Sequence, residues 1–381
     1  MSPSQQLPII IVGAGIVGLT LAQALKKEGI PFQVYERDRS LDARSAGWGL
    51  SIYWALSTLE NCLPPDLFKE LDSIQVDPQQ SLKDTGRYVF LDLETAEPRY
   101  VIPPSFRRRV SRLKLRKLLA KGIDVRWDKC ISGFKHTENG ISVFFTDGTE
   151  AEGSALVAAD GSGSKIRQIL MGDELGCLNK LPAHYLSATL RLTEEEVNPL
   201  RNIDPLMFQG SHPDTGFYLF YSLLSTPEVN GSSETDGPYY EAQFDVSWAV
   251  KGPEDHVPET NADRLAKMRS APAAGTGFEK TLREIIENIP EGTVTLVGDA
   301  AHAMTMYRGQ AANHGITDAA NLTQQVKLWH QGKKTRLEAL ADYETEMIKR
   351  GYEAVILSRQ ACLDSYNIQN LRPDSPLVGR R

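Results

Sequence analysis

The sequence predicts an α/β fold in which a lobe built on a parallel sheet carries a second, antiparallel lobe. Three features of the 381-residue chain support this expectation: a glycine-rich turn between a buried strand and a helix, two further buried runs that each lead to an acid, and several runs of alternating polarity. Continuous apolar runs are typical of parallel strands buried on both faces, whereas alternation is typical of strands with one solvated face. A chain of this length can bury more than one core.

The first strand is the apolar run Ile9–Val12, which leads through a glycine-rich turn into a helical pattern over Ile16–Lys27. Glycines in such a turn let a pyrophosphate approach the free amides at the start of the helix. A second strand, Phe32–Tyr35, ends in Glu36, close to the roughly 20 positions after Gly18 at which an acid binds a ribose 2′-hydroxyl. An ordinary turn would not need this acid. The pattern therefore predicts a dinucleotide site, and the negative charge favours FAD or NAD over NADP.

Two later buried runs also lead to acids. Ser154–Ala159 leads to the motif Asp-Gly-x-x-Ser-x-x-Arg, which begins at Asp160, and Thr293–Val297 leads to Gly-Asp-Ala-Ala-His, which contains Asp299. Parallel strands would bring both acids to the sheet edge that carries the glycine turn. For Asp160 an alternative stays open, because an acid and a serine at these offsets can simply cap the following helix.

The rest of the chain predicts the second lobe and a C-terminal helix. Apolar periodicity from Lys333 to about Tyr366 is helical, and the tail after Asn370 has no such period and is expected to be loose. The runs that alternate, and so predict an antiparallel sheet inserted into the first lobe, are Arg87–Leu93, Tyr185–Leu192, Phe217–Leu223 and Glu241–Val250.

Composition narrows the function classes. A net charge of −7 and a pI near 5.6 give no general attraction for nucleic acid or for an anionic membrane. The four cysteines include no Cys-x-x-Cys pair, so no zinc or redox site of the usual spacing is expected. No apolar stretch reaches the ~20 residues that span a bilayer, and residues 1–8 are too short and polar for a signal peptide. We expect a soluble, cytoplasmic protein without a metal.

The chain carries three motifs in order: Gly-x-Gly-x-x-Gly from Gly13, the Asp160 motif and the Asp299 motif. In these motifs and their spacing it resembles the FAD-dependent monooxygenases of the para-hydroxybenzoate hydroxylase type. It is most similar to fungal members that modify secondary metabolites. The resemblance implies a Rossmann-like FAD-binding lobe of the glutathione-reductase type, an inserted antiparallel substrate lobe and a C-terminal helix. The implied limits are 1–75, 105–175 and 276–335 for the FAD-binding domain, 76–104 and 176–275 for the substrate domain, and 336–381 for the helix and tail.

The resemblance also implies the cofactor site. Glu36 would bind the adenosine ribose, Asp299 the ribityl or pyrophosphate part, and Asp160 would serve both FAD and the NADPH or NADH that docks briefly to reduce it. Arg112 stands in the family's Arg-x-x-Leu signature, whereas Arg108, Arg109, Lys114 and Arg116 are expected to be solvated charges. The implied FAD-binding residues are Gly13, Gly15, Gly18, Glu36, Arg37, Arg44, Gly49, Arg112, Asp160, Asp299, Gly309, Ala311 and Ala312.

The chain departs from the family after His302. The usual continuation Pro-x-x-Pro-x-x-Gly-x-Gly-x-Asn has lost both prolines, which are Ala303 and Met306 here, and its second glycine, which is Ala311. Amides at a helix N-terminus can still stabilise negative charge on a reduced flavin, and an alanine is tolerated at 311 unless the backbone there needs a positive φ. We expect an intact flavin site and an altered substrate side.

Candidate catalytic residues come from the inserted sheet. Fungal relatives carry an arginine and a tyrosine at positions that match Arg191 and the pair Tyr218 and Tyr221. A guanidinium could polarise a developing oxyanion, and a phenol could hydrogen-bond a substrate oxygen. Arg191 could equally be a surface charge at a strand end. His302, His184 and His314 are interpreted as structural.

The expected function is a monooxygenase that takes hydride from NADPH or NADH onto FAD, reacts with O2 and inserts one oxygen atom into an aromatic ring or alkene of a small organic molecule. The lost prolines motivate an alternative, an FAD-scaffolded oxidase or cyclase that inserts no oxygen. A third possibility is a non-catalytic carrier on the same fold, although the intact Asp160 motif disfavours it.

Overall fold

The computed structural model describes residues 7–43, 47–178, 180–235, 237–250, 252 and 293–379. Arg44 and the proposed domain limit at residues 275 and 276 lie outside these ranges. The centre of the larger lobe is a parallel sheet in the order β16-β11-β1-β2-β7, in which Ile9 pairs with both Ala155 and Phe32. Its strands are β1 (Ile9–Val12), β2 (Phe32–Tyr35), β7 (Val125–Arg126), β11 (Ala155–Ala158) and β16 (Val294–Leu296).

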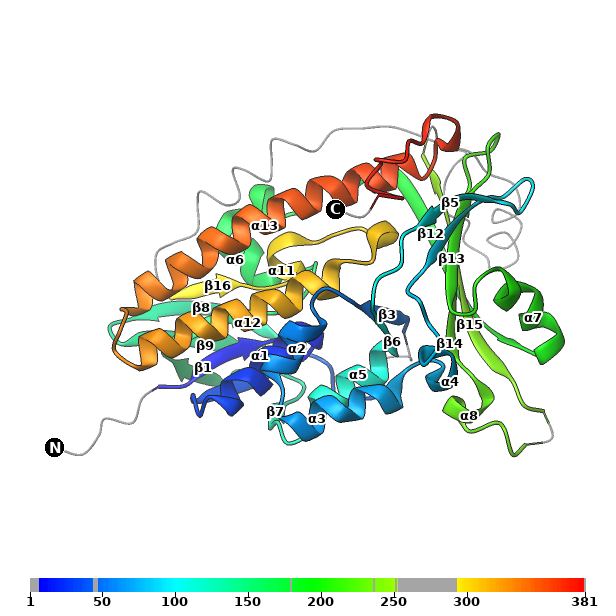
Figure 1. Ribbon diagram of the computed structural model, residues 1–381. Coiled ribbons are helices and arrows are strands. Elements are labelled where there is room, and N and C mark those ends of the chain that lie inside the picture. Colours follow the sequence, from blue (N-terminus) through cyan, green and yellow to red (C-terminus); the bar gives the residue numbers. More distant parts are fainter. Residues whose placement is uncertain are drawn as a thin grey trace.

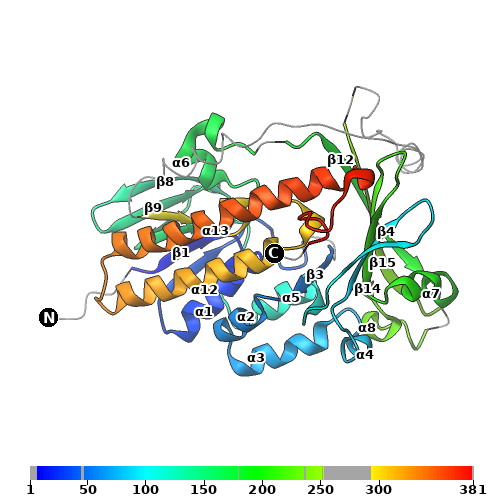
Figure 2. The ribbon, with the colours of Figure 1, turned by 45° about the horizontal axis from the view of Figure 1, so that its top comes forward.

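The parallel sheet is the middle of three layers (Figure 1). One face packs on helices, because the side chains of Ile9, Ile11 and Val34 join a core that these helices share. The other face, with Ile10 and Val12, packs on a three-stranded antiparallel sheet and on α6 (Lys165–Leu175), as Figure 2 also shows. The helices are α1 (Ile16–Lys27), α2 (Leu56–Cys62), α5 (Arg112–Leu119), α12 (Ala311–His330) and α13 (Arg336–Asp364), and the strands of the small sheet are β8 (Ile131–Thr137), β9 (Gly140–Phe145) and β10 (Glu150–Gly153).

The second lobe is a six-stranded sheet in the order β12-β15-β14-β13-β4-β5. The expectation of a purely antiparallel sheet was wrong in one detail, because β13 and β4 run parallel, with Phe208 opposite Val89. Helix α7 (Glu194–Ile203) covers the outer face, and the inner face looks toward the first lobe (Figure 1). The strands are β4 (Tyr88–Asp92), β5 (Pro98–Ile102), β12 (Ala183–Leu192), β13 (Met207–Ser211), β14 (Tyr218–Ser225) and β15 (Tyr240–Ala249).

A two-stranded ribbon lies between the lobes. Strand β3 (Gly49–Ile52) pairs with β6 (Arg108–Ser111), with Ser51 opposite Arg109. Both strands contact β14 of the six-stranded sheet, so side chains of the ribbon reach the second lobe. The short elements near it are α3 (Pro65–Lys69), η1 (Glu70–Ile74), α4 (Pro78–Ser81) and α8 (Pro227–Asn230).

The C-terminal tail is packed, so the expectation of a loose tail was wrong. After η4 (Ile368–Asn370), the side chains of Leu371, Leu377 and Val378 are buried against α13 and the inner face of the six-stranded sheet. Tyr100 Oη donates to the carbonyl oxygen of Leu371 at 2.6 Å. The sequence of the tail has no helical or strand period because its buried apolar side chains, and not regular secondary structure, hold it in place. No helix in the described part of the chain is long and apolar enough to cross a membrane.

Candidate active site

The glycine turn after β1 forms a cradle for a phosphate group. Gly13 has a φ of 112°, and a Cβ there would lie 2.2 Å from the carbonyl oxygen of Ala159. A Cβ on Gly18 would lie 2.0 Å from the carbonyl oxygen of Gly13, so the helix can approach the strand only because both residues are glycines. Gly15 precedes α1, where no described side chain caps the helix and nothing lies within 4 Å of an added Cβ. The free amides and the open space fit a pyrophosphate.

Glu36 is placed beside this cradle by the end of β2. Its Oε2 accepts a hydrogen bond from the amide of Ala14 at 2.6 Å, and its Oε1 accepts from the amide of Asp38 at 3.0 Å. A carboxylate has about four acceptor positions, so Glu36 can still bind ribose hydroxyls. Arg116 Nη2 lies 3.5 Å from Glu36 Oε2 and 3.2 Å from Asp38 Oδ2, while its Nε donates to the carbonyl oxygen of Ala14 at 2.7 Å.

The Asp160 motif caps helix α6. Asp160 Oδ2 accepts from the amide of Lys165 at 2.9 Å, and Ser164 Oγ accepts from the amide of Arg167 at 3.0 Å. The buried guanidinium of Arg167 donates to three carbonyl oxygens, including that of Ala300 at 2.8 Å, and so ties α6 to the Asp299 turn. The capping interpretation of this motif is therefore correct for both Asp160 and Ser164. Asp160 Oδ1 is buried and has no partner among the described residues.

The Asp299 turn, with α11 (Asp299–His302), is fixed by the buried carboxylate of Asp318 on α12. Asp318 Oδ2 accepts from the amide of Gly298 at 2.6 Å and lies 2.7 Å from His302 Nε2, and Asp318 Oδ1 accepts from Arg350 at 2.6 Å. Burial alone would lower the pKa of His302, but the charge of Asp318 outweighs it and raises that pKa. His302 thus has the structural role expected of it. Burial raises the pKa of Asp299, and the charge of His302 opposes that rise.

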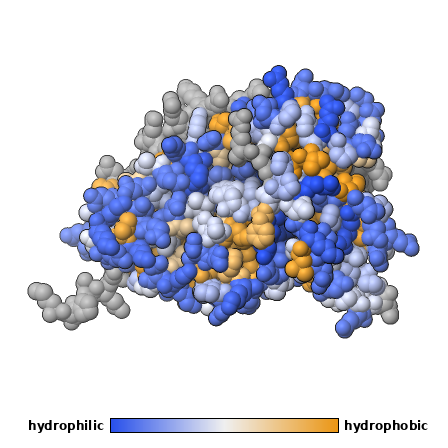
Figure 3. All heavy atoms as spheres, viewed as in Figure 1, coloured by the Kyte–Doolittle hydropathy of each residue, from blue (hydrophilic) through white to orange (hydrophobic). Residues whose placement is uncertain are grey.

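A cavity of about 2040 Å³ lies between the two lobes, lined by both of them and by the C-terminal tail. Pockets for one small ligand typically have about 300 to 1000 Å³, so this volume accommodates part of a cofactor and a substrate together. On the face shown in Figure 3, hydrophobic side chains gather in the band between the lobes, and Trp48, Trp54 and Phe106 are exposed where they line the cavity. The sequence-predicted cofactor residues that line it are Gly49, Asp299, Gly309, Ala311 and Ala312.

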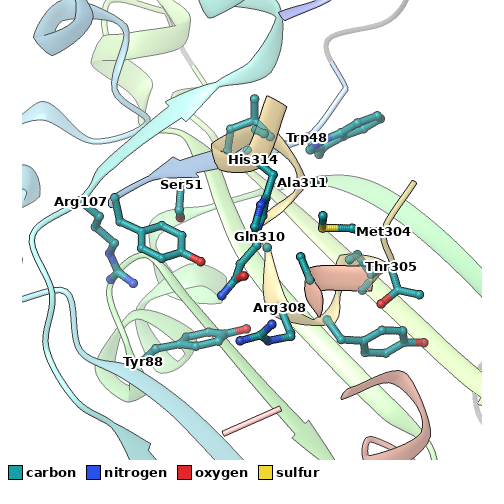
Figure 4. Close-up of a pocket in the computed structure, with 18 of the residues that line it drawn as sticks. Trp48, Ser51, Tyr88, Arg107, Met304, Thr305, Arg308, Gln310, Ala311 and His314 are labelled. Atoms are coloured by element: carbon teal, nitrogen blue, oxygen red, sulfur yellow. The ribbon is translucent and has the colours of Figure 1, made fainter. Parts of the chain in front are cut away.

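The altered loop after His302 keeps a helix N-terminus in the cavity. Met306–Arg308 forms the turn η3, Gly309 follows with a φ of 60°, and α12 then begins at Ala311. Ala311 is not among the described residues with positive φ, so the loss of the family's second glycine causes no backbone strain there. No described side chain caps α12, and its first amides are free to face an anion. Figure 4 shows Arg308 and Gln310 of this loop beside Ser51 and Tyr88.

The six-stranded sheet contributes a polar wall. Asp245 on β15 lines the cavity, and Gln243 Nε2 lies 2.8 Å from each of its carboxylate oxygens. Burial raises the pKa of Asp245, and the hydrogen bonds from Ser187 and Gln243 oppose that rise. Tyr307 Oη lies 2.8 Å from Ser247 Oγ on the same strand. The wall therefore presents a carboxyl group to the cavity, and Tyr307 of η3 is hydrogen-bonded to the same strand.

The three catalytic candidates are not brought together. Arg191 is exposed at the far end of β12, 4.4 Å from the ring of Tyr239, and it does not line the cavity. Tyr221 is buried on the outer face of β14, where it stacks on Phe208 beneath α7. Tyr218 is on the inner face, with its ring 4.8 Å from that of Tyr307, and its hydroxyl donates to Gln209 Oε1 at 2.6 Å. Only Tyr218 adjoins the wall of the cavity.

Two of the four charges expected to be solvated are buried instead. Arg116 holds the Glu36 region, and Arg109, 5% exposed, lines the cavity and donates to Ser51 Oγ at 3.1 Å and Ser222 Oγ at 2.6 Å. Sequence reasoning missed both because basic residues crowd this segment and nothing local separates inward from outward positions. Alternation along 107–109 was the available signal, since Arg107 and Arg109 are both buried and Arg108 is half-buried.

Arg112 and Arg37 are the remaining predicted cofactor residues in the described part of the chain. Arg112 begins α5, with its guanidinium 4.7 Å from the ring of Trp48, and it contributes positive charge near Asp299. Arg37 is exposed next to Glu36. Gly49 has a packing role that the resemblance did not imply, because a Cβ there would lie 2.7 Å from Arg109 Nη2.

Comparison with known proteins agrees with this geometry. The FAD binding domain family matches residues 6–191 and 265–357. The chain is 49% identical over 348 residues to the FAD-dependent monooxygenase dbaB of Emericella nidulans, covering 85% of this chain and 87% of that protein. The chain belongs to the FAD-dependent monooxygenase family. It is also 34% identical to the FAD-dependent monooxygenase phnB of Penicillium herquei, with 93% and 90% of the two chains covered.

The fold of this flavoprotein also matches solved structures. The 2,6-dihydroxypyridine-3-hydroxylase of Arthrobacter nicotinovorans superposes with a TM-score of 0.72 at 19% identity, covering 99% of this chain and 97% of that one. The predicted fold class, an FAD-binding Rossmann-like lobe with an inserted substrate lobe, is thereby confirmed. FAD is the cofactor of the family, and NAD(P)H is its general reductant.

Proposed function

We propose that this protein inserts one oxygen atom from O2 into an aromatic ring or alkene of a small organic molecule, by hydroxylation or epoxidation, in a fungal secondary-metabolite pathway. The observation that carries the proposal is the cavity between the lobes, which is lined by the Asp299 turn, the start of α12 and the polar wall of the six-stranded sheet. Its fungal relatives of comparable length are named FAD-dependent monooxygenases.

Different residues of the chain would bind different parts of the cofactor in this site. The cradle at Gly13 and Gly15 and the carboxylate of Glu36 would bind the pyrophosphate and the adenosine ribose, and Asp299 would hold the ribityl part. Bound FAD supplies the redox chemistry, accepting hydride from NADPH or NADH and passing electrons to O2. The amides at the start of α12 would stabilise the negative charge that reduction brings. A substrate bound between the two lobes would shield the flavin from water, which would favour oxygen transfer over wasteful release of hydrogen peroxide.

We assign the residues that act on the substrate to the polar wall rather than to the strand end. Asp245 can accept a proton from a substrate hydroxyl, because its carboxyl faces the cavity and its raised pKa makes it a better base. Tyr218 can support the wall through Tyr307. Arg191 and Tyr221 do not reach the cavity, and we propose no step for either.

The experiment is an NADPH- and NADH-oxidation assay of the purified yellow protein with phenols, indoles and polyketides, in air and under anaerobic conditions, with hydrogen peroxide counted. The proposal expects one substrate class to speed flavin reduction and to yield an oxygenated product. Oxidised or cyclised product without added oxygen would instead support the FAD-scaffolded oxidase or cyclase that the lost prolines at Ala303 and Met306 suggest.

A further inference from the structure

We propose that Arg109 forms a binding site for an anionic oxygen of the substrate, a carboxylate or a phenolate. This inference rests on the proposed function, since it concerns the substrate side of the same cavity. Arg109 is part of the ribbon strand β6, and its side chain extends to Ser222 on β14 of the second lobe. Its guanidinium therefore lies where the lobes meet.

The guanidinium is a buried cation without a paired anion. Its two hydrogen-bond acceptors, Ser51 Oγ and Ser222 Oγ, are neutral, its Nε has no partner among the described residues, and no described carboxylate lies within 4.0 Å of it. Burial lowers the pKa of Arg109 to about 10, so the group is still positively charged at neutral pH. A buried charge of this kind is costly until an anion satisfies it.

Other buried arginines of the chain have more complete partners, since even Arg167, which has no ion pair among the described residues, donates to three carbonyl oxygens. Arg107, two residues away, lies 2.8 Å from Asp84, and Arg116 pairs with Glu36 and Asp38. The backbone also makes room for the Arg109 guanidinium, because a Cβ on Gly49 would lie 2.9 Å or less from three of its atoms. The fold therefore holds a planar two-donor group at the cavity wall and gives it no ion pair among the described residues.

The surroundings favour an aromatic anion. The ring of Phe220 lies 5.9 Å from Arg109 Cζ, and Met207 and Tyr88 line the cavity beside it. Asp245 is an acidic side chain that lines the same cavity and influences Arg109 electrostatically. A ring bearing a carboxylate or phenolate would place its anionic oxygen on Arg109 and its apolar surface on Phe220. Asp245 is the cross-strand partner of Phe220 in the same sheet, and its negative charge would weaken the binding of that oxygen.

Calorimetric titration of the FAD-loaded protein without NADPH tests the proposal with matched probes. For the carboxylate arm the probes are 4-nitrobenzoate and 4-nitrobenzamide, which differ mainly in charge. For the phenolate arm they are 4-nitrophenol, titrated below and above its own pKa, and 4-nitroanisole. We expect the wild type to prefer at least one anionic probe over its neutral partner by about 10- to 100-fold, the range of a charged hydrogen-bond pair. The arm that shows the preference identifies the anionic group.

Arg109→Gln should abolish the preference, whereas Arg109→Lys should keep part of it, because a point charge lacks the two-donor fork. Arg107→Gln is the matched control and should retain the preference, since the charge of Arg107 is already paired. Asp245→Asn should strengthen binding of the anionic probe. FAD content and thermal unfolding establish that each variant is folded.

A wild type without charge preference in either arm, or a preference that survives in Arg109→Gln, would overturn the proposal. So would equal weakening of charged and neutral probes together with a shifted flavin reduction potential, which would assign Arg109 to the cofactor. Because no turnover is measured, these outcomes are independent of whether an oxygenated product forms.

Discussion

Glu36 has two roles at the cofactor cradle, since its carboxylate holds the glycine turn through Ala14 and faces the expected position of the ribose. Both roles depend on Arg116, which is almost fully buried and contacts Glu36, Asp38 and the Ala14 carbonyl. Arg116→Gln should lower the free energy of unfolding by about 3 to 5 kcal/mol, as expected when one partner of a buried pair is removed. It should also reduce FAD content.

Urea unfolding and the FAD-to-protein ratio measure both effects. Lys117→Gln is the control on the same helix, because Lys117 is half-exposed and pairs with the exposed Asp42, a contact worth about 0 to 1 kcal/mol. Equal small losses in the two variants would show that the buried pair does not hold the cradle.

His314 makes stability depend on pH. Burial, aided by the charges of Arg350 and His302, lowers its pKa to about 4. Because this pKa lies below the unfolded value of about 6.5, the unfolded chain binds more protons between the two values, and stability falls as the pH drops through that window. His314→Gln should therefore lose less stability than the wild type between about pH 6.5 and pH 4. Parallel curves of unfolding free energy against pH would contradict this account.

Gly309 and Gly332 flank α12 with nearly the same backbone conformation, so substitutions at the two positions can distinguish a structural role of this helix from a role at the flavin. Gly309 precedes the helix at the cavity with a φ of 60°, and Gly332 follows it, away from the cavity, with a φ of 67°, and both have open space around an added Cβ. Alanine at either position should cost about 1 kcal/mol of stability from backbone strain. Only Gly309→Ala should slow flavin reduction by NADPH, measured by stopped-flow absorbance, because it shifts the first amides of α12. Equal reduction rates in both variants would remove α12 from the flavin site.

Elements with strong local signals were predictable, and those held by distant contacts were not. The run Ile9–Val12, the glycine turn and the period of α13 are local patterns, and the structure confirms them. The tail after Asn370 has no period, yet Leu377 and Val378 bury against another lobe, which no sequence window reveals. The side chains that line the cavity were hard to predict for the same reason. The position of the Arg109 guanidinium depends on its contact with Ser222, which is more than a hundred residues away in the sequence. The positions of the motif acids, in contrast, could be predicted from the strands that directly precede them.

At the scale of the whole molecule, the six-stranded sheet faces the larger lobe (Figures 1 and 2). Residues of both lobes line the cavity between them. The parallel sheet positions the cofactor cradle and the Asp299 turn. Asp245 of the six-stranded sheet, Tyr307 of η3 and Arg109 of the ribbon strand β6 line the cavity. Neither lobe alone encloses a substrate. The account therefore predicts that oxygen transfer is coupled to substrate binding between the lobes.

The most direct test of this account is the origin of the oxygen in the product. The protein is supplied with NADPH, its best substrate from the assay above and ¹⁸O₂ in unlabelled water, and the product is analysed by mass spectrometry. The account predicts one ¹⁸O atom in the product for each NADPH consumed, with little hydrogen peroxide. A product whose added oxygen comes from water, or a product with no added oxygen, would contradict it.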